Sequence, residues 1–333
     1  MSSRTFREFV ALAEQQGLVR RVTKSVDVSW EPGCLAKWVF QALPENDRFG
    51  LLFDNVEGSD LSLCTGALGA SRQSYALALD VEPEQINAQW ENALVNQLKP
   101  VTVEKAPCQE VVLQGDDAKL SDLPIPTWTP GKDPAPYITT TVMTKLVDSD
   151  NQNSGVYRTL VRDDHHVVVN MNPRRGGHDQ CETWWKQGKA APVAWVIGAD
   201  PAYQLASCAT LPTGVQEMEV AGGLMGTPIE LVKCVTNDIL VPANAEIIIE
   251  GVIEPGERDT EGPFGENLGF MCEVSQKPVA RITAITRRKD AIYYGMTSQM
   301  PPSESTMLQS NATAGMINKL LRHDLGERTI CDF

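Results

Sequence analysis

Between residues 137 and 297 the chain passes through eight segments that are crowded with β-branched residues and mostly separated by turn-forming ones. They read YITTTVMTKLV, VYRTLVR, HHVVVNM, PVAWVIG, IELVKCV, EIIIEGVI, PVARITAIT and AIYYGMT. Such runs are typical of β-strands, because branched side chains pack well on a pleated surface. Only two helical patterns interrupt them, HDQCETWWKQG and a segment that begins near Glu217. This pattern favours an antiparallel barrel or sandwich over a doubly wound sheet.

The first hundred residues alternate between helical and extended patterns instead. Thr5 and Glu8 can form a capping box for a helix that ends near Gly17. The apolar positions of that helix are Phe6, Phe9, Val10 and Leu12. GLVRRV and GLLFDNV predict strands, and two more helices are expected, one with Leu35, Trp38, Val39 and Leu43 and one over PEQINAQWENALVNQL with Ile86, Trp90, Ala93 and Leu94. Residues 1–106 are therefore predicted to form an α/β domain.

The composition changes near residue 107. The segment LPIPTWTPGKDPAPY, residues 123–137, is so rich in proline that it excludes a regular helix or a central strand, which predicts an ordered wrap or a boundary loop. We place the β-rich domain at residues 107–302. After MPPSE, residues 303–333 can supply one helix and a short extension.

Charge and cysteine spacing exclude several classes of protein. A net charge of −14 argues against a nucleic-acid or anionic-membrane partner. No run of eighteen apolar residues predicts a spanning helix, and the N-terminus resembles an amphipathic helix more than a signal peptide. The eight cysteines form no CxxC pair, which indicates reduced thiols. The expected location is cytoplasmic.

Common nucleotide-binding and hydrolase motifs are missing from the sequence. It contains no GxGxxG, Walker A, HExxH or GxSxG pattern. AGGLMG, residues 221–226, is rich in glycine but follows an apparent helix rather than a strand, so it is a weak candidate for a phosphate cradle.

Two stretches combine arginine with glycine. In NSGVYR, residues 153–158, Asn153 offers an amide oxygen, Gly155 permits close approach of the backbone, and Arg158 suits a carboxylate if it points inward. In NPRRGG, residues 172–177, two arginines precede a glycine pair at a helix start, a combination that suits a phosphate. The alternatives are an exposed strand arginine and a solvated basic turn.

Two further stretches carry carboxylates. In SCATLPTGVQEMEVAGG, residues 207–223, Glu217 begins a helix, where it could stabilise the helix dipole or bind a hard cation beside a phosphate. Glu219 competes for that role. TEGPFGENLG, residues 260–269, places Glu261 and Glu266 around a tight turn. With Arg158 they would form an Arg–Glu–Glu cluster in which one glutamate neutralises the guanidinium and the other transfers a proton.

These stretches together resemble the UbiD family of reversible decarboxylases, which use prenylated FMN. The motifs NSGVYR, RRGG, GVQEMEVAGGLMG and EGPFGENLG occur in the family's order, and the likeness extends from the N-terminal helix to MPPSE. The resemblance implies an N-terminal α/β region, a split β-barrel that binds the flavin, and a C-terminal α/β domain that mediates oligomerisation. Family members continue well beyond this length, so the C-terminal domain is expected to be largely absent here.

The resemblance also implies residue roles. Asn153 and Glu217 match ligands of a divalent ion, usually Mn²⁺ (or Mg²⁺), that bridges protein and flavin phosphate. The positions that match cofactor-contacting segments are Gly155, Val156, Tyr157, Arg158, Ser207 and Cys208, the last two in a loop near the phosphate and a monovalent cation such as K⁺. Arg158, Glu261 and Glu266 match the catalytic set, with Glu266 as the proton donor.

The chain departs from the family pattern at one metal ligand. Some members carry a histidine where Arg174 stands here, and His178 lies four residues later. We therefore assign Arg174 and Arg175, with Gly176, to the phosphate, and leave a histidine ligand open.

The implied function is reversible decarboxylation of an aromatic, heteroaromatic or α,β-unsaturated acid. A flavin prenyltransferase would supply the cofactor, and the family forms homodimers or larger assemblies. Two alternatives remain open. One is a non-catalytic flavin- or phosphate-binding barrel that is inactive without its C-terminal domain, and the other is an ordinary FMN oxidoreductase, which has no need of an Arg–Glu–Glu cluster.

Overall fold

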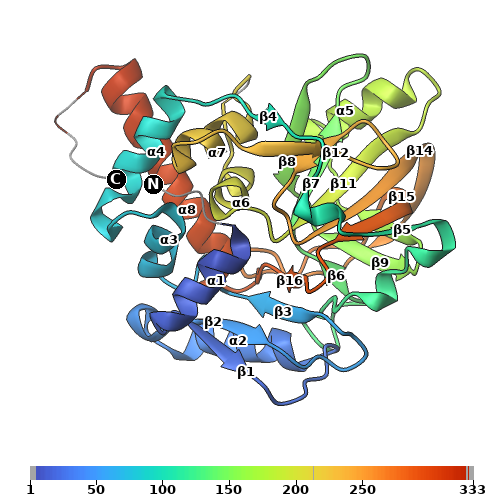
Figure 1. Cartoon of the computed structure of the whole chain (residues 1–333), viewed down its shortest axis with the longest axis horizontal. Coiled ribbons are helices and arrows are strands. Elements are labelled where there is room, and N and C mark those ends of the chain that lie inside the picture. Colours follow the sequence, from blue (N-terminus) through green and yellow to red (C-terminus); the bar gives the residue numbers. More distant parts are fainter. Residues whose placement is uncertain (1–4, 213, 328, 330–333) are drawn as a thin grey trace.

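The computed structural model describes residues 5–212, 214–327 and 329 (Figure 1). Its helices are α1 (Phe6–Gln15), α2 (Glu31–Ala42), α3 (Arg72–Leu79), α4 (Ile86–Val95), α5 (Gly176–Trp185), α6 (Pro201–Cys208), α7 (Glu217–Met225) and α8 (Glu304–Lys319). The first eight strands are β1 (Val19–Val22), β2 (Gly50–Phe53), β3 (Ser62–Thr65), β4 (Val101–Thr102), β5 (Val111–Gln114), β6 (Tyr137–Ile138), β7 (Thr141–Lys145) and β8 (Gln152–Val156). The others are β9 (Thr159–Asp163), β10 (His166–Val169), β11 (Ala191–Ile197), β12 (Glu230–Lys233), β13 (Leu240–Pro242), β14 (Ile247–Glu261), β15 (Ser275–Arg287) and β16 (Ile292–Tyr294).

A nine-stranded sheet dominates the right of Figure 1. Its order is β6-β9-β10-β15-β14-β11-β7-β8, with β5 added to β15, and every pairing is antiparallel. The predicted antiparallel β unit is confirmed as a curled half-barrel within a mixed α/β fold. β11 is buried along its whole length. Both faces of the sheet are therefore shielded from water at this strand.

Two short connections explain why this sheet curls. β6 and β7 are separated by only two residues in the chain, and so are β8 and β9, yet these strands lie at opposite ends of the sheet. Two residues reach roughly 10 Å between the flanking Cα atoms at most, so the sheet must bend until its ends approach each other. We call this region the seam. The residues that cross it are Thr139 and Thr140 in one connection and Tyr157 and Arg158 in the other.

Two predicted strands leave the main sheet, so the expectation that all eight form one antiparallel unit is wrong for them. IELVKCV forms β12, which pairs with β13 and β4 in a small separate sheet. AIYYGMT forms β16, which returns to the N-terminal sheet and pairs with β3 in parallel, in the order β1-β2-β3-β16. Strand propensity reports a fit to a pleated surface and carries no information about which strand becomes the neighbour.

The predicted N-terminal elements are confirmed. α1 has half of the expected capping box, because the Thr5 backbone N–H donates to Glu8 at 2.9 Å while the Thr5 hydroxyl has no partner among the described residues. The helix ends ahead of Gly17, whose φ of +75° suits glycine. Its buried face differs by one position, because Ala13 is buried where Leu12 was expected and Leu12 is half-buried. α2, α4 and strands β1 and β2 occupy the predicted segments.

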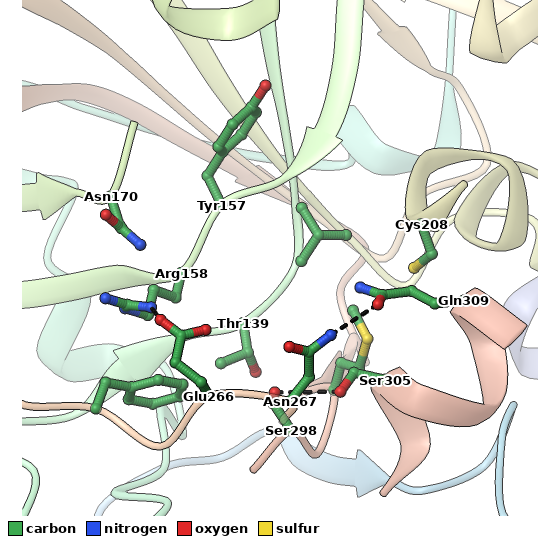
Figure 2. Close-up of a pocket in the computed structure, with 13 residues that line it drawn as sticks. Thr139, Tyr157, Arg158, Asn170, Cys208, Glu266, Asn267, Ser298, Ser305 and Gln309 are labelled. Atoms are coloured by element: carbon green, nitrogen blue, oxygen red, sulfur yellow. Dashed lines mark hydrogen bonds and ion pairs between the residues drawn. The ribbon is translucent and has the colours of Figure 1, made fainter. Parts of the chain in front are cut away.

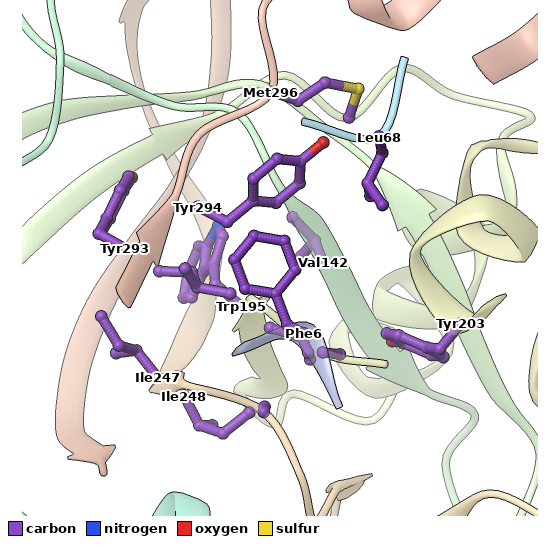
Figure 3. Close-up of a cluster of buried hydrophobic side chains, with 14 of the residues drawn as sticks. Phe6, Leu68, Val142, Trp195, Tyr203, Ile247, Ile248, Tyr293, Tyr294 and Met296 are labelled. Atoms are coloured by element: carbon purple, nitrogen blue, oxygen red, sulfur yellow. The ribbon is translucent and has the colours of Figure 1, made fainter. Parts of the chain in front are cut away.

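One hydrophobic core joins the N-terminal region to the curled sheet (Figure 3). Phe6 of α1 lies with its ring 5.0 Å from that of Tyr294 in β16, measured between centroids. Trp195 of β11 and Tyr203 of α6 are fully buried in the same core. The proline-rich segment is irregular up to β6, as predicted, and α8 is the predicted C-terminal helix. The divisions at residues 106 and 302 stay predictions.

A buried carboxylate at the start of α6 gives the fold a testable pH dependence. Asp200 is 1% exposed, and burial raises the pKa of its carboxyl to about 7. In the unfolded chain the pKa of this carboxyl is near 3.9. The folded state therefore holds a proton that the unfolded state has released, so the free energy of unfolding is highest below about pH 4 and falls as the pH rises to about 7. We expect the free energy of unfolding of Asp200→Asn, relative to the wild type, to be roughly 3 kcal/mol higher at pH 8 than at pH 4.5. Urea unfolding at the two pH values measures this difference. Exposed Asp116, changed to Asn, is the control; an equal offset at both pH values would contradict the assignment.

Candidate active site

Arg158, in the seam, holds the two glutamates of the 260–269 turn. Its Nε and Nη2 donate to Oε1 and Oε2 of Glu261 at 2.8 and 3.0 Å, and its Nη1 donates to Oε1 of Glu266. The Arg158 side chain is 11% exposed, Glu261 is fully buried, and Glu266 is 41% exposed. The predicted cluster is therefore assembled, and the alternative of an exposed strand arginine is wrong.

The two glutamates occupy different environments. Glu261 is the last residue of β14, and it also accepts a hydrogen bond from the Tyr137 hydroxyl at 3.2 Å. Glu266 follows in the turn, where its backbone N–H donates to the Phe270 carbonyl at 2.7 Å. Burial holds the pKa of Tyr137 well above its usual range, so its hydroxyl stays a donor. Glu261 is fixed on both oxygens, whereas Glu266 has a solvent-facing side.

Two residues that the sequence did not single out support the guanidinium. The Sγ of Cys272 accepts from Arg158 Nη2 at 2.9 Å and from the Phe264 backbone N–H at 3.2 Å. The Phe264 ring lies 5.4 Å from the guanidinium carbon, and packs 4.4 Å from the Tyr137 ring. Burial raises the pKa of the Cys272 thiol, which keeps it a neutral acceptor. These contacts fix the plane of the guanidinium.

A cavity of about 180 Å³ opens beside this cluster (Figure 2). Arg158 and Glu266 lie on one side of it, and Gln309 and Cys208 on the other. The remaining lining residues are Thr139, Val156, Tyr157, Asn170, Phe264, Asn267, Met296, Ser298 and Ser305. Asn267 of the 260–269 turn donates through Nδ2 to Oε1 of Gln309 in α8 at 2.7 Å.

The two predicted metal ligands lie next to the same strand. Glu217, the first residue of α7, accepts from the backbone N–H of Ser154 at 3.3 Å, and Asn153 is the adjacent residue of β8. Burial raises the pKa of the Glu217 carboxyl to about 6. Within the described ranges, no three His, Cys, Asp or Glu side chains form a group that could hold a metal. A cation here would have Asn153 and Glu217 as oxygen ligands and would need the rest from a phosphate and water.

Three glycines permit close packing at the start of α5. A Cβ at Gly176 would overlap with Oδ1 of Asn153, and one at Gly155 would lie 2.9 Å from the Tyr157 ring. The Gly177 backbone N–H donates to the Tyr157 hydroxyl at 3.0 Å. Asn153 and Tyr157 are thus held against the N-terminal end of α5, and helix N-termini in general favour an anion.

The basic residues beside this helix end are exposed, and the histidine is not. Arg174 and Arg175 both face solvent, which agrees with a solvated basic turn and leaves them accessible to a phosphate. Arg174 has a φ of +65°, and its backbone N–H donates to Asp179. His178 is buried with its ring edge-on to Trp185, the centroids 5.6 Å apart. Neither of its ring nitrogens has a hydrogen-bond partner among the described residues.

Most of the chain matches one known protein family. Residues 99–301 match the family described as the 3-octaprenyl-4-hydroxybenzoate carboxy-lyase Rift-related domain, and residues 10–94 match its N-terminal domain. The chain belongs to the UbiD family.

Solved structures of UbiD-class enzymes superpose on nearly the whole chain. HmfF from Pelotomaculum thermopropionicum, in complex with FMN, is 33% identical with a TM-score of 0.87, over 96% of this chain and 70% of HmfF. Vanillic acid decarboxylase from Sedimentibacter hydroxybenzoicus is 26% identical (TM-score 0.88; 98% and 70% covered). The 3,4-dihydroxybenzoic acid decarboxylase from Enterobacter cloacae is 27% identical (TM-score 0.86; 96% and 70%). An evolved form of HmfF is dimeric and contains prFMN.

One local prediction needs correction in this UbiD-family chain. Ser207 and Cys208 were expected in a loop, but they form the last turn of α6, where the Ser207 hydroxyl donates to the Tyr203 carbonyl at 2.8 Å. A helix starting at Pro201 was missed because it is only eight residues long. AGGLMG belongs to α7 and its cap, and its first two glycines allow close approach to the backbone of residues 93–98, which explains them without a phosphate.

Glu304 is a further residue that the sequence did not reveal. It is fully buried at the start of α8 and accepts from the backbone N–H groups of Gly66, Leu68 and Thr297 at 3.0 Å each. The Tyr294 hydroxyl donates to it at 2.9 Å. Its neighbour Ser305 lines the cavity, so Glu304 holds this end of α8 in the site. Only the PPSE motif marked the position.

Proposed function

We propose that this UbiD-family chain reversibly decarboxylates an aromatic, heteroaromatic or α,β-unsaturated acid with prenylated FMN. The observation that carries the proposal is the arginine that is paired with one buried and one half-exposed glutamate at the wall of a cavity. Flavin redox chemistry requires no such cluster. A decarboxylase requires a cation to orient the leaving carboxylate and an acid to protonate the carbon that remains.

Arg158 binds the substrate carboxylate through its Nη1 edge. Nε and one N–H of Nη2 are occupied by Glu261, whereas Nη1 donates, among the described residues, to the half-exposed Glu266 alone. A substrate carboxylate at Nη1 lies next to Glu266. Glu266 is therefore the residue that delivers a proton to the carbon left behind by CO₂.

Glu261 keeps the arginine in place while this happens. Its two oxygens hold the guanidinium in a bidentate pair, and the Tyr137 hydroxyl supplies a further donor. Bidentate pairing fixes the orientation of the plane as well as the charge. Glu261 thus holds Arg158 from a fully buried position, whereas the half-exposed Glu266 is accessible to solvent and substrate.

The residues around α5 and α7 fit a flavin phosphate and a divalent ion. Prenylated FMN, when bound, supplies an electron sink for the pair left behind by CO₂. Val156 and Tyr157 of the cavity wall, with Gly155, would contact the ring system, and Arg174, Arg175 and Gly176 would contact the phosphate. Asn153 and Glu217 would ligate Mn²⁺ or Mg²⁺. Ser207 and Cys208, at the end of α6, would lie near the phosphate and a K⁺ ion.

Other parts of the proposal concern the assembly. A flavin prenyltransferase would supply the cofactor. The half-barrel would correspond to one part of the family's split barrel, and a C-terminal domain, if joined to this chain, would support a homodimer or larger assembly. No helix in the described ranges is long and apolar enough to cross a membrane.

Co-expression with a flavin prenyltransferase tests the function. We expect the purified protein to carry prenylated FMN and about one Mn²⁺ per chain, measured by mass spectrometry and elemental analysis, and to release CO₂ from at least one acid in an aromatic and cinnamate-type panel. Asn153→Ala should lose the metal, while Asn151→Ala, an exposed neighbour, should retain it. Flavin bound without any turnover would instead support the non-catalytic barrel.

A further inference from the structure

Gln299 has a backbone conformation that is unusual for its residue type. Its φ is +90°, in the left-handed region that glycine adopts readily and that residues with a Cβ disfavour. The residue is 6% exposed, and its Nε2 has no hydrogen-bond partner among the described residues. A strained backbone and a buried unpaired donor each cost free energy, and strained residues cluster at functional sites. Gln299 therefore requires a functional explanation.

Anchors on both sides hold Gln299 in this conformation. Before it in the chain, the Thr297 backbone N–H donates to the buried Glu304 at 3.0 Å. After it, the Met300 carbonyl accepts from Nε2 of Gln41 in α2 at 2.8 Å. The neighbours of Gln299 are thus fixed to two different helices, and a strained residue persists when the surrounding structure determines its conformation in this way.

The side chain of Gln299 lies against the loop that carries Glu266. This loop is a short hairpin, residues 264–272, which we call the Glu266 hairpin. At its base the Cys272 backbone N–H donates to the Phe264 carbonyl at 2.8 Å, and the backbone N–H of Glu266 is bonded within the hairpin as described above. A contact that fixes the hairpin therefore also fixes the place from which the Glu266 side chain extends.

The contact is made at Gly265, the residue before Glu266. A Cβ at Gly265 would lie 2.7, 3.1 and 3.1 Å from Cγ, Cβ and Cδ of Gln299, which are its three nearest atoms outside the adjoining residues. The φ of Gly265 lies outside the left-handed region, so the missing side chain serves this contact rather than the backbone. On the other side of Glu266, a Cβ at Gly269 would lie 3.2 Å from Sδ of Met300. Residues 299 and 300 together support the hairpin.

We propose that Gln299 is a positioning residue that holds the Glu266 hairpin, and with it the proton donor, at the cavity. The inference rests on the proposed function for what Glu266 does there. A different φ at residue 299 would turn its Cβ away from Gly265, which explains why the strained conformation is retained. Arg158 is held by other residues, Glu261 and Cys272, so binding of the substrate carboxylate and delivery of the proton depend on separate contacts.

Gln299→Gly in the prenylated-FMN holoenzyme tests this role. Glycine removes the packing on Gly265 and relieves the left-handed φ. We expect kcat for the best acid of the panel to fall by about 10- to 100-fold, because a misplacement of about 1 Å in an active site costs up to that much. KM should stay near the wild-type value, and Tm should not fall. Gln299→Met, which keeps the length of the side chain and removes the unpaired amide, should retain kcat.

Asp80→Gly is the matched control for the release of strain. Asp80 also has a left-handed φ, +57°, but it lies at the end of α3. This change should leave kcat, KM and the bound flavin as in the wild type. A kcat that falls equally in both glycine variants would show that the loss is unspecific and would overturn the role of Gln299.

Gly265→Ala tests the same contact from the hairpin. In the wild type the added methyl group meets Gln299, so kcat should fall by at least about 10-fold. In the Gln299→Gly background the methyl group enters the space that glutamine has left, so Gly265→Ala should cause no further loss. Losses that multiply in the double variant would show that the two residues act independently, which would overturn the proposal.

Hydrogen exchange separates this inference from the proposed function. Mass spectrometry of the FMN-loaded protein measures exchange of the backbone amides of residues 264–272, which should be several-fold faster in Gln299→Gly and unchanged in Asp80→Gly. Faster exchange, in a protein whose wild type releases no CO₂, would sustain the support of the hairpin by Gln299 and overturn the decarboxylase. Wild-type kcat in Gln299→Gly, or a fall in kcat accompanied by a higher KM and a lower Tm, would overturn the positioning role and sustain the decarboxylase.

Discussion

Glu266→Gln is expected to abolish decarboxylation while the protein still folds and retains its flavin. An amide of the same shape can still accept from Arg158 Nη1, and the side chain is 41% exposed, so neither packing nor a buried charge is lost. What is lost is the exchangeable proton. General acid catalysis typically contributes 10²- to 10⁴-fold, so kcat should fall by about that factor. The measurements are CO₂ release and incorporation of solvent deuterium into the product, both of which should disappear together.

Glu273→Gln provides the matched control for this prediction. Glu273 is exposed, lies seven residues further along the same loop, and should tolerate the change without loss of rate. Unfolding curves for both variants should overlay that of the wild type. Near-normal turnover by Glu266→Gln, with flavin bound, would remove Glu266 from the role of proton donor.

Glu304→Ala should produce the largest loss of stability of any single change considered. The substitution leaves three backbone N–H groups and the Tyr294 hydroxyl without their acceptor in a fully buried site. Each unsatisfied buried donor costs about 1–3 kcal/mol, so a decrease of roughly 4 kcal/mol or more in the free energy of unfolding is expected. Glu304→Gln, which keeps one acceptor oxygen, should lose about half as much. Urea denaturation followed by far-ultraviolet circular dichroism measures both.

Exposed Glu84, changed to Ala, is the control for the same chemical change at a surface position. It should stay within about 0.5 kcal/mol of the wild type, as surface substitutions usually do. A Glu304→Ala protein that unfolds with the wild-type midpoint would show that the four donors find water or other partners, and that α8 needs no such anchor.

The sequence predicted that Arg158, Glu261 and Glu266 form one cluster, because each of them lies in a motif with its own chemical logic. A glutamate pair around a tight turn and an arginine after a glycine predict a cluster once they are considered together. The fold class could be predicted equally well, because runs of β-branched residues separated by turns indicate where the strands lie. Helix α1 and its cap followed from Thr5, Glu8 and Gly17 in the same way.

The sequence could not predict the rest of the site, because that part depends on which strands become neighbours. Thr139 lies in a run of three threonines, and only the seam determines that the first of them faces the cavity. Gln309 lies beyond the predicted end of the β-rich domain, and only the packing of α8 returns it to the cavity. Glu304 could not be found from the sequence either, because two of its backbone donors, Gly66 and Leu68, lie more than 200 residues away in the chain.

The seam also makes enzymatic activity a reporter of complete folding. Arg158 lies in a two-residue link between opposite ends of the sheet, and its partner Glu261 is 103 residues further along the chain, at the end of β14. Contacts between residues so far apart in sequence form late, since the intervening chain must be ordered first. A partly folded chain can hold helices and hairpins, but it cannot hold this ion pair. During refolding, recovery of activity should therefore lag behind recovery of secondary structure and coincide with closure of the sheet.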